Sequence, residues 1–463
     1  MDFLKSLALP QSTEHFHLLL FMLNLVFIIF LPYFGFLLGS SVLSVLANRR
    51  GRSKGDAVQT KFARDLIDTA MFSMSGVAFL AIIPALSMVF LLAQILQSTP
   101  AIAAGLMAFG FLALLAGAIL LYWYRYTFRV SGMLSSIETQ ATAGDPMLSV
   151  AELKAYARSN EESNLKSARW GIALLIIASI LVVGAITVTS NPSHWTDIES
   201  IAELFMSPDF LVRYLQFVAV ALGATGIGVL FFFFSWGGGI AKPVEPYGLM
   251  VRGRAVRLGI ISLLLQPVCI VGTVALMPVE ALSGVVFGLA GLSLLAFFLT
   301  AHFVYAYKKE RSEGYVAYAF YALGIALVLL FTKDQVAISN ATKSQAVALS
   351  AAFDREVEDL KGKLGIVMTA MTGQDIYNAK CSACHLFDQK KVGPPYRDLV
   401  PKYAGKKPQL IAFILNPVKV DPAYPNMPNQ GLKPTEADSI ASFLLAKFTG
   451  KAPQPATPQA TAK

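Results

Sequence analysis

The chain has 463 residues, of which 55% are hydrophobic and only 14% are charged. Its mean hydropathy of +0.57 excludes an ordinary soluble globular protein, in which roughly a quarter of the residues are charged. The formal net charge of +9 must be read together with the position of the basic residues, because a basic surface serves either nucleic-acid binding or membrane topology.

Eight apolar segments are long enough to cross a lipid bilayer, so the sequence predicts a bundle of transmembrane helices. They cover approximately residues 17–47, 66–97, 101–124, 169–189, 210–236, 256–277, 281–306 and 314–333. Very short connections join the second span to the third and the sixth to the seventh, which predicts two tight helical hairpins. The loop after the third span, residues 126–168, is polar and is predicted to contain one surface helix near residues 150–160.

Lysine and arginine concentrate in the loops after the first, third, fifth and seventh spans, and the other three loops contain neither. The positive-inside rule therefore predicts that the basic loops are cytoplasmic and that both termini lie outside. We expect a multi-pass protein of the bacterial inner (cytoplasmic) membrane, with lipid around it. The basic loops account for much of the net charge, so no nucleic-acid partner is expected.

Four histidines lie in or near the spans. The predicted topology puts His15 and His17 at the outer end of the first span, His194 in an outer loop and His302 near the inner end of the seventh span. Two stacked b-type haems need four histidines in two pairs of matched depth, and His302 is separated from the others by most of the bilayer. A cytochrome b of the quinol:cytochrome c reductase kind is therefore excluded by ligand count.

The beginning of the first span, Glu14-His15-Phe16-His17, resembles the start of the first helix in the large subunit of cytochrome bd-type quinol oxidases. That resemblance implies a haem b ligated by His17. The predicted depths in the membrane allow His194 or a methionine as the second ligand: Met22, Met88 or Met277. An interfacial histidine that binds nothing is the alternative. The ionisable candidates for quinol chemistry near the outer face are His17, Glu14 and His194, because an imidazole can accept a quinol proton near neutral pH.

The segment Cys381-Ser382-Ala383-Cys384-His385 has the C-x-x-C-H pattern of covalent attachment of a c-type haem. Two thiols at this spacing can bond to the two vinyl groups of one porphyrin, and the adjacent imidazole can bind the iron. A redox dithiol, a chance spacing or half of a zinc site are the alternatives. The chain has three cysteines, so no second pair completes a zinc site.

Residues 370–449 resemble a class I monohaem cytochrome c. The resemblance rests on the haem motif, on Gly373 and Tyr377 before it, on Gly393-Pro394 after it, and on an amphipathic run over residues 435–448. It implies that the Gly373 helix crosses the C-terminal helix and that Met427 is the distal ligand of one covalent haem c. Axial ligation by His385 and Met427 leaves no open coordination position, which suits electron transfer rather than oxygen chemistry.

The predicted fold is all-α, with a membrane bundle of about eight helices followed by a small periplasmic cytochrome c domain. The predicted domains are a membrane domain over 1–335, a helical spacer over 336–369, the cytochrome domain over 370–449 and a disordered tail over 450–463.

Two functions fit this organisation. In the first, the chain is a subunit of a respiratory complex. It passes electrons from the quinol pool, directly or through a partner subunit, by way of haem c to a periplasmic redox partner. Whether the chain itself oxidises quinol is left open. In the second, the bundle is only an anchor or assembly scaffold for a partner oxidase or reductase. Eight spans exceed what anchoring needs, because one helix suffices, and this favours the first function.

Overall fold

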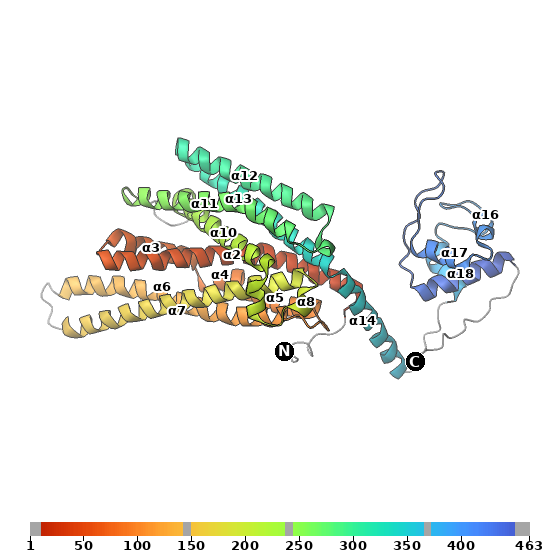
Figure 1. Ribbon diagram of the computed structural model, residues 1–463, viewed down its shortest axis with the longest axis horizontal. Coiled ribbons are helices and arrows are strands. Elements are labelled where there is room, and N and C mark those ends of the chain that lie inside the picture. The colour runs from red at the N-terminus through yellow and green to blue at the C-terminus, as the bar shows by residue number, and fades with distance from the viewer. Residues whose placement is uncertain (1–10, 142–149, 237–243, 365–371, 450–463) are drawn as a thin grey trace. The chain divides into compact units, whose positions relative to one another are not determined.

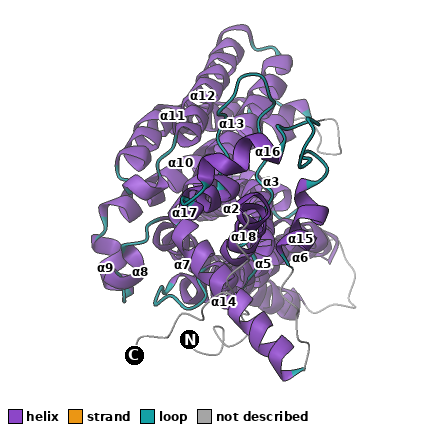
Figure 2. Ribbon diagram, turned by 90° about the vertical axis from the view of Figure 1, so that its right-hand side faces the viewer, coloured by secondary structure: helices purple, strands orange, loops and turns teal. Residues whose placement is uncertain are grey.

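The computed structural model describes residues 11–141, 150–236, 244–364 and 372–449. Every regular element in these ranges is helical, as the helix and loop colouring of Figure 2 shows. The predicted all-α fold is therefore confirmed. The chain divides into two compact units, Met1–Arg355 and Glu356–Lys463. The predicted tail, 450–463, lies outside the described residues.

The first unit holds the apolar helices. Its elements in chain order are α2 (Thr13–Lys54), α3 (Ala57–Ala70), α4 (Met74–Val77), η1 (Ala78–Ile82), α5 (Ile83–Ile95), α6 (Ala103–Ala141), α7 (Val150–Ser190), α8 (His194–Asp197), α9 (Ile201–Met206), α10 (Pro208–Leu230), η2 (Phe231–Ser235), α11 (Tyr247–Ala275), η3 (Val279–Ala281), α12 (Gly284–Glu310) and α13 (Glu313–Ala341). Within the described ranges, eight stretches are long and apolar enough to cross a membrane. The protein is accordingly a multi-pass membrane protein.

The second predicted span, 66–97, was placed too early. The helix is interrupted between Ala70 and Met74, and the membrane span begins at Met74. A separate capping residue starts each of the two helices. The Asp56 carboxylate accepts the Val58 N–H at 2.9 Å and starts α3, whereas the Ser73 hydroxyl accepts the Gly76 N–H at 2.9 Å and starts α4. Helix α3 is thus a separate element before the membrane span.

The polar segment predicted as a loop over 126–168 is mostly helical. Helices α6 and α7 both continue beyond their apolar parts and run side by side, as Figure 1 shows. The predicted surface helix near 150–160 is the beginning of α7. Buried asparagines join the two helices here: Asn164 donates to the Thr127 hydroxyl at 2.6 Å and accepts from Asn48 of α2 at 2.9 Å. These hydrogen bonds satisfy polar groups that the apolar packing would otherwise leave unpaired.

Small residues allow the central helices to approach closely. A Cβ atom on Gly39 of α2 would lie 2.3 Å from the Thr225 hydroxyl oxygen and 2.8 Å from the Ala221 carbonyl oxygen of α10. A Cβ atom on Gly226 of α10 would lie 2.6 Å from the Ala255 carbonyl oxygen of α11. Helix association in membranes depends on such van der Waals contact, so these glycines fix α10 between α2 and α11.

The second unit is small and helical. Helix α14 (Lys343–Lys363) runs across the boundary between the units, and α15 (Gly373–Ile376), η4 (Tyr377–Cys381), α16 (Tyr396–Leu399), η5 (Val400–Tyr403), α17 (Lys407–Leu415) and α18 (Pro434–Thr449) follow it. Helix α15 crosses α18 at Gly373, where a Cβ atom would lie 2.3 Å from Phe443 Cβ and 2.5 Å from the Ser439 carbonyl oxygen. This is the crossing that the cytochrome c resemblance implied.

Candidate functional site

The segment that carries the two cysteines folds into a widened helical turn followed by a tighter one. The Ser382 N–H donates to the Tyr377 carbonyl at 2.8 Å, which widens the last helical turn before Cys381. The N–H groups of Cys384 and His385 then donate to the Cys381 carbonyl at 3.1 and 2.9 Å. These turns bring the two thiols and the imidazole to one place in the fold.

A capping box starts the helix that leads into this segment. The Thr372 hydroxyl accepts the Asp375 N–H at 3.3 Å, and the Asp375 carboxylate accepts the Thr372 N–H and hydroxyl at 3.0 and 2.6 Å. The hydrogen bond from the Thr372 hydroxyl, followed by that from its N–H, lowers the pKa of Asp375 below its ordinary value. The box is therefore fully formed at neutral pH.

His385 is held by groups on both sides of its ring. Its Nδ1 lies 2.8 Å from the Pro394 carbonyl oxygen, so Nδ1 carries the proton and Nε2 keeps its lone pair for a metal. A Cβ atom on Gly393 would lie 2.4 Å from His385 Cε1, so only glycine leaves room for the imidazole. The Tyr396 ring stacks on the imidazole with 4.9 Å between ring centroids. Burial raises the pKa of the Tyr396 phenol, which stays neutral.

Met427 lies in the loop between α17 and α18. Its neighbours anchor that loop to the rest of the domain. The Asn429 side chain donates to the Leu415 carbonyl at 2.9 Å, and the Lys390 ammonium lies 4.7 Å from the centroid of the Tyr424 ring. The methionine is half-buried and faces the same cavities as Cys381 and His385.

A cavity of about 560 Å³ lies between the cysteine-histidine segment and the loop that carries Met427. Such a volume is within the range of roughly 300–1,000 Å³ that small-molecule and cofactor sites have. Cys381, His385 and Met427 line it together with apolar side chains of α17 and α18, among them Leu410, Ile414, Ile440 and Leu444. A smaller adjoining cleft is lined by Cys384 as well as by Cys381, His385 and Met427. Both thiols, the imidazole and the thioether therefore meet at the smaller cleft, which opens beside the larger cavity. A covalent haem with two axial ligands requires these groups.

Known proteins match this part of the chain. The family model of cytochrome c matches residues 370–447. Cytochrome c-551 of Pseudomonas denitrificans is 35% identical over 80 residues, which are 95% of its length and 16% of this chain. The chain belongs to the cytochrome c family. Cytochrome c-552 of Hydrogenobacter thermophilus is 37% identical over 71 residues, 70% of its length and 14% of this chain.

Membership of the cytochrome c family implies a covalently bound haem c and electron transfer. The residues of the second unit fit that group, because most of the side chains that line the cavity are apolar and the contact of Nδ1 with the Pro394 carbonyl leaves His385 Nε2 available for iron. The matches concern residues of the second unit and do not support the resemblance of the first span to cytochrome bd-type quinol oxidases. These relatives therefore do not indicate to which protein family the membrane unit belongs.

The structure places the quinol-side candidates in two different settings. Glu14 and His17 are exposed on α2, where lipid or water would meet them. His194, at the start of α8, is half-buried. Its Nε2 lies 3.1 Å from the Asn191 side-chain nitrogen, and its Nδ1 lies 3.4 Å from an Asp209 carboxylate oxygen. Within the described ranges, no hydrogen bond or ion pair joins His17 to His194.

Sequence reasoning missed a buried group of charges in the membrane unit. Lys333 and Asp334 of α13 and Arg213 of α10 are all at most 8% exposed. The Asp334 carboxylate lies 2.9 Å from Lys333 Nζ and 3.3 Å from Arg213 Nη1. Lys333 also donates to the Thr273 hydroxyl of α11 at 3.3 Å, and Arg213 donates to the Ser190 hydroxyl of α7 at 3.2 Å. The charge cluster thus connects four helices.

The cluster was missed because the last span was predicted to end at residue 333, which put the charges at the membrane surface. Helix α13 continues to Ala341, and its apolar residues Ala337 and Ile338 are fully buried. A signal for this was present in the sequence, since an apolar run follows the Lys-Asp pair. Asp209, which contacts His194, lies one helical turn before Arg213 on α10. The structure therefore brings the His194 site next to the charge cluster.

Proposed function

We propose that this cytochrome c is a subunit of a respiratory electron-transfer complex. It carries electrons from the quinol pool, directly or through a partner subunit, to a periplasmic redox partner protein by way of one haem c. The observation that supports this most is the buried charge cluster beside His194. A bundle that served only as an anchor or assembly scaffold, which is the alternative function, would have no use for costly buried charges.

Four residues of the cytochrome unit would hold the haem. Cys381 and Cys384 would attach it through thioether bonds, and His385 Nε2 and Met427 Sδ would be the two axial ligands of the iron. The group would supply one-electron chemistry at a raised potential. The Pro394 carbonyl orients the imidazole, and the absence of a side chain on Gly393 leaves room for the ring. With both axial positions taken by the chain, the site would exchange electrons and bind no substrate.

The distribution of basic residues supports a fixed orientation in a bacterial inner membrane. The loops after the first, third, fifth and seventh spans carry the lysines and arginines, so these loops would be cytoplasmic. Both termini and the cytochrome unit would then lie in the periplasm. Covalent haem attachment by Cys381 and Cys384 would take place on that side.

The outer end of the bundle is where quinol chemistry would occur in this chain. His194 is the strongest of the three candidates, because Asp209 can stabilise the imidazolium that forms when it accepts a proton. The Asp209 carboxylate is itself held by the Ser207 hydroxyl and by the Phe210 N–H at 2.9 Å. His17 and Glu14 are exposed, so they can meet a quinol headgroup that arrives from the lipid.

A haem b in the membrane unit is less well supported than this role. Both ring nitrogens of His194 already face polar partners, and an iron would have to displace one of them. Of the methionines at similar depth, Met88 is fully buried and Met22 is 41% exposed, so they face different surroundings. The proposal therefore needs only one haem in this chain.

Quinol-dependent reduction of the c haem tests the proposed function. In stopped-flow experiments on the intact complex with a soluble quinol, His194→Ala is expected to slow reduction at least tenfold, since a lost general base typically costs about 100-fold or more. His17→Ala is expected to slow it less. The control is His302→Ala, an exposed residue of α12, which should match the unchanged protein. Equal rates of haem reduction in all four proteins would contradict a role of the bundle in quinol oxidation and would favour the scaffold function.

The distal ligand can be tested separately. Met427→Ala is expected to keep haem attached and to lower its midpoint potential by on the order of 100 mV, a fraction of the ~0.8 V over which axial ligands set haem potentials. The thioether favours the reduced iron, and its loss removes that preference. Spectroelectrochemical titration measures the effect. Met206→Ala, which removes an 82% exposed methionine of α9, is the matched control. An unchanged potential in Met427→Ala would assign the distal position to another residue.

A further inference from the structure

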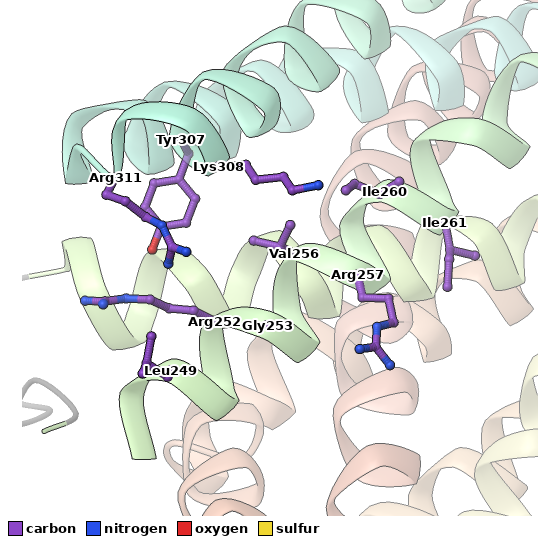
Figure 3. A pocket seen from close by; sticks show the side chains of 10 residues that line it. All are labelled: Leu249, Arg252, Gly253, Val256, Arg257, Ile260, Ile261, Tyr307, Lys308 and Arg311. Carbon is purple, nitrogen blue, oxygen red and sulfur yellow. The ribbon is translucent and has the colours of Figure 1, made fainter. Parts of the chain in front are cut away.

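A second concave site lies in the membrane unit, between the first half of α11 and the end of α12. Its volume is about 360 Å³. Four cationic side chains line it: Arg252 and Arg257 from α11, and Lys308 and Arg311 from the end of α12. Figure 3 shows these side chains around the groove, with the buried Tyr307 extending from α12 toward α11. These cations are among the basic residues that follow the fifth and seventh predicted spans, which the positive-inside rule places on one side of the membrane.

The positive charge of this groove is only partly compensated. Arg252 pairs with Glu245 at 3.1 Å and lies over the Phe234 ring. Arg257, Lys308 and Arg311 are exposed and form no ion pair with the carboxylates of the described ranges. Like charges that line one groove repel each other, and the low-dielectric walls strengthen the field that attracts an anion. The groove is therefore built for a negatively charged ligand.

The groove is apolar at the end that lies further along α11. Ile260 and Ile261, which follow Arg257 in that helix, line this end. From there an exposed apolar stripe continues along α11 at helical spacing, with Leu264 70% exposed, Val268 69% and Val271 61%. These residues lie in the membrane-spanning part of the helix. A ligand that uses the whole site must therefore carry an anionic head and a long apolar chain.

We propose that this groove binds one anionic phospholipid. Its phosphate would lie among Arg257, Lys308 and Arg311, and one acyl chain would follow Ile261, Leu264 and Val268. A free phosphate ion matches only the cationic part of the site, whereas a phospholipid matches both parts. Basic pockets between transmembrane helices on the cytoplasmic side are suited to anionic lipid headgroups, and the basic loops place this groove on that side in the proposed orientation.

Native mass spectrometry of the haem-containing full-length protein tests this site. The unchanged protein should retain one phosphatidylglycerol molecule after exchange into detergent. Arg257→Gln/Lys308→Gln should bind phosphatidylglycerol at least about tenfold more weakly, since each removed cation reduces the attraction to an anionic lipid. The matched control is Arg49→Gln/Lys54→Gln, which removes two exposed cations at the end of α2. This control should bind as the unchanged protein does.

Two further probes distinguish the source of the phosphate. Phosphatidylcholine, which has the same phosphate and acyl chains but no net charge, should bind much more weakly than phosphatidylglycerol. Millimolar inorganic phosphate should not displace the bound lipid. Displacement by phosphate, equal retention of phosphatidylcholine, or equal lipid binding in the groove and control variants would each overturn the proposal. Should the double variant fail to fold, Lys308→Gln alone changes one exposed side chain and is measured in the same way.

Discussion

Replacement of Cys384 or Cys381 by alanine is expected to abolish covalent haem in this protein. Each thiol would form one thioether bond to the porphyrin, and both thiols line the cleft beside His385. Haem staining of a denaturing gel measures the result, because only covalently attached haem survives denaturation. The stained band at the mass of the full chain should disappear. The Cys381→Ala/Cys384→Ala double variant removes any attachment through a single remaining thiol.

The third cysteine provides the control for this experiment. Cys269 is buried in α11 and lies in the membrane unit, away from the haem motif in the sequence. Cys269→Ala should stain as strongly as the unchanged protein. Staining at full intensity in the double variant would refute attachment through the Cys381 and Cys384 pair.

Replacement of Asp334 by alanine is expected to have the largest effect on stability. Among the described residues, this carboxylate is the one that pairs with both buried cations, Lys333 and Arg213. Its removal leaves two like charges uncompensated in the interior, and loss of one partner of a buried ion pair costs about 3–5 kcal/mol. Thermal unfolding of the purified protein in detergent, followed by circular dichroism, should show a clearly lower midpoint temperature.

Two further variants test whether the loss of stability comes from the burial of the charges and from their mutual repulsion. Glu162→Ala breaks the exposed pair between Glu162 and Lys166 in α7 and should cost about 0–1 kcal/mol. Adding Lys333→Met to Asp334→Ala removes one of the two uncompensated cations and should restore part of the lost stability. Simple addition of the two single effects would show that the three charges do not act as one cluster.

The candidate haem site could be predicted from the sequence because its chemistry is local. Cys381, Cys384 and His385 are neighbours in the chain, and the requirement for two thiols and an imidazole fixes their spacing. The crossing of the Gly373 helix with the C-terminal helix followed from the family resemblance, and the structure explains it through the close approach of Ser439. The structure adds the contact between His385 Nδ1 and the Pro394 carbonyl oxygen. This contact forms because the loop after the haem motif folds back onto the imidazole.

The bilayer likewise makes helical membrane spans predictable, because a helix that crosses the lipid must be long and apolar. Hydropathy therefore located eight spans but not where each helix begins. The cap at Ser73 starts the second span later than predicted, and the polar segment after the third span continues α6 and begins α7, which a buried asparagine joins.

Three features were decided by tertiary structure alone. Lys333, Asp334 and Arg213 look like membrane-surface charges in the sequence, and only the packing of α7, α10, α11 and α13 buries them together. The contact between His194 and Asp209 and the cationic groove between α11 and α12 also join residues that are distant in the chain. Composition and local spacing indicate which segments enter the membrane and which residues would bind haem. Long-range pairing of side chains depends on how the helices pack, and a hydropathy pattern carries no information about that.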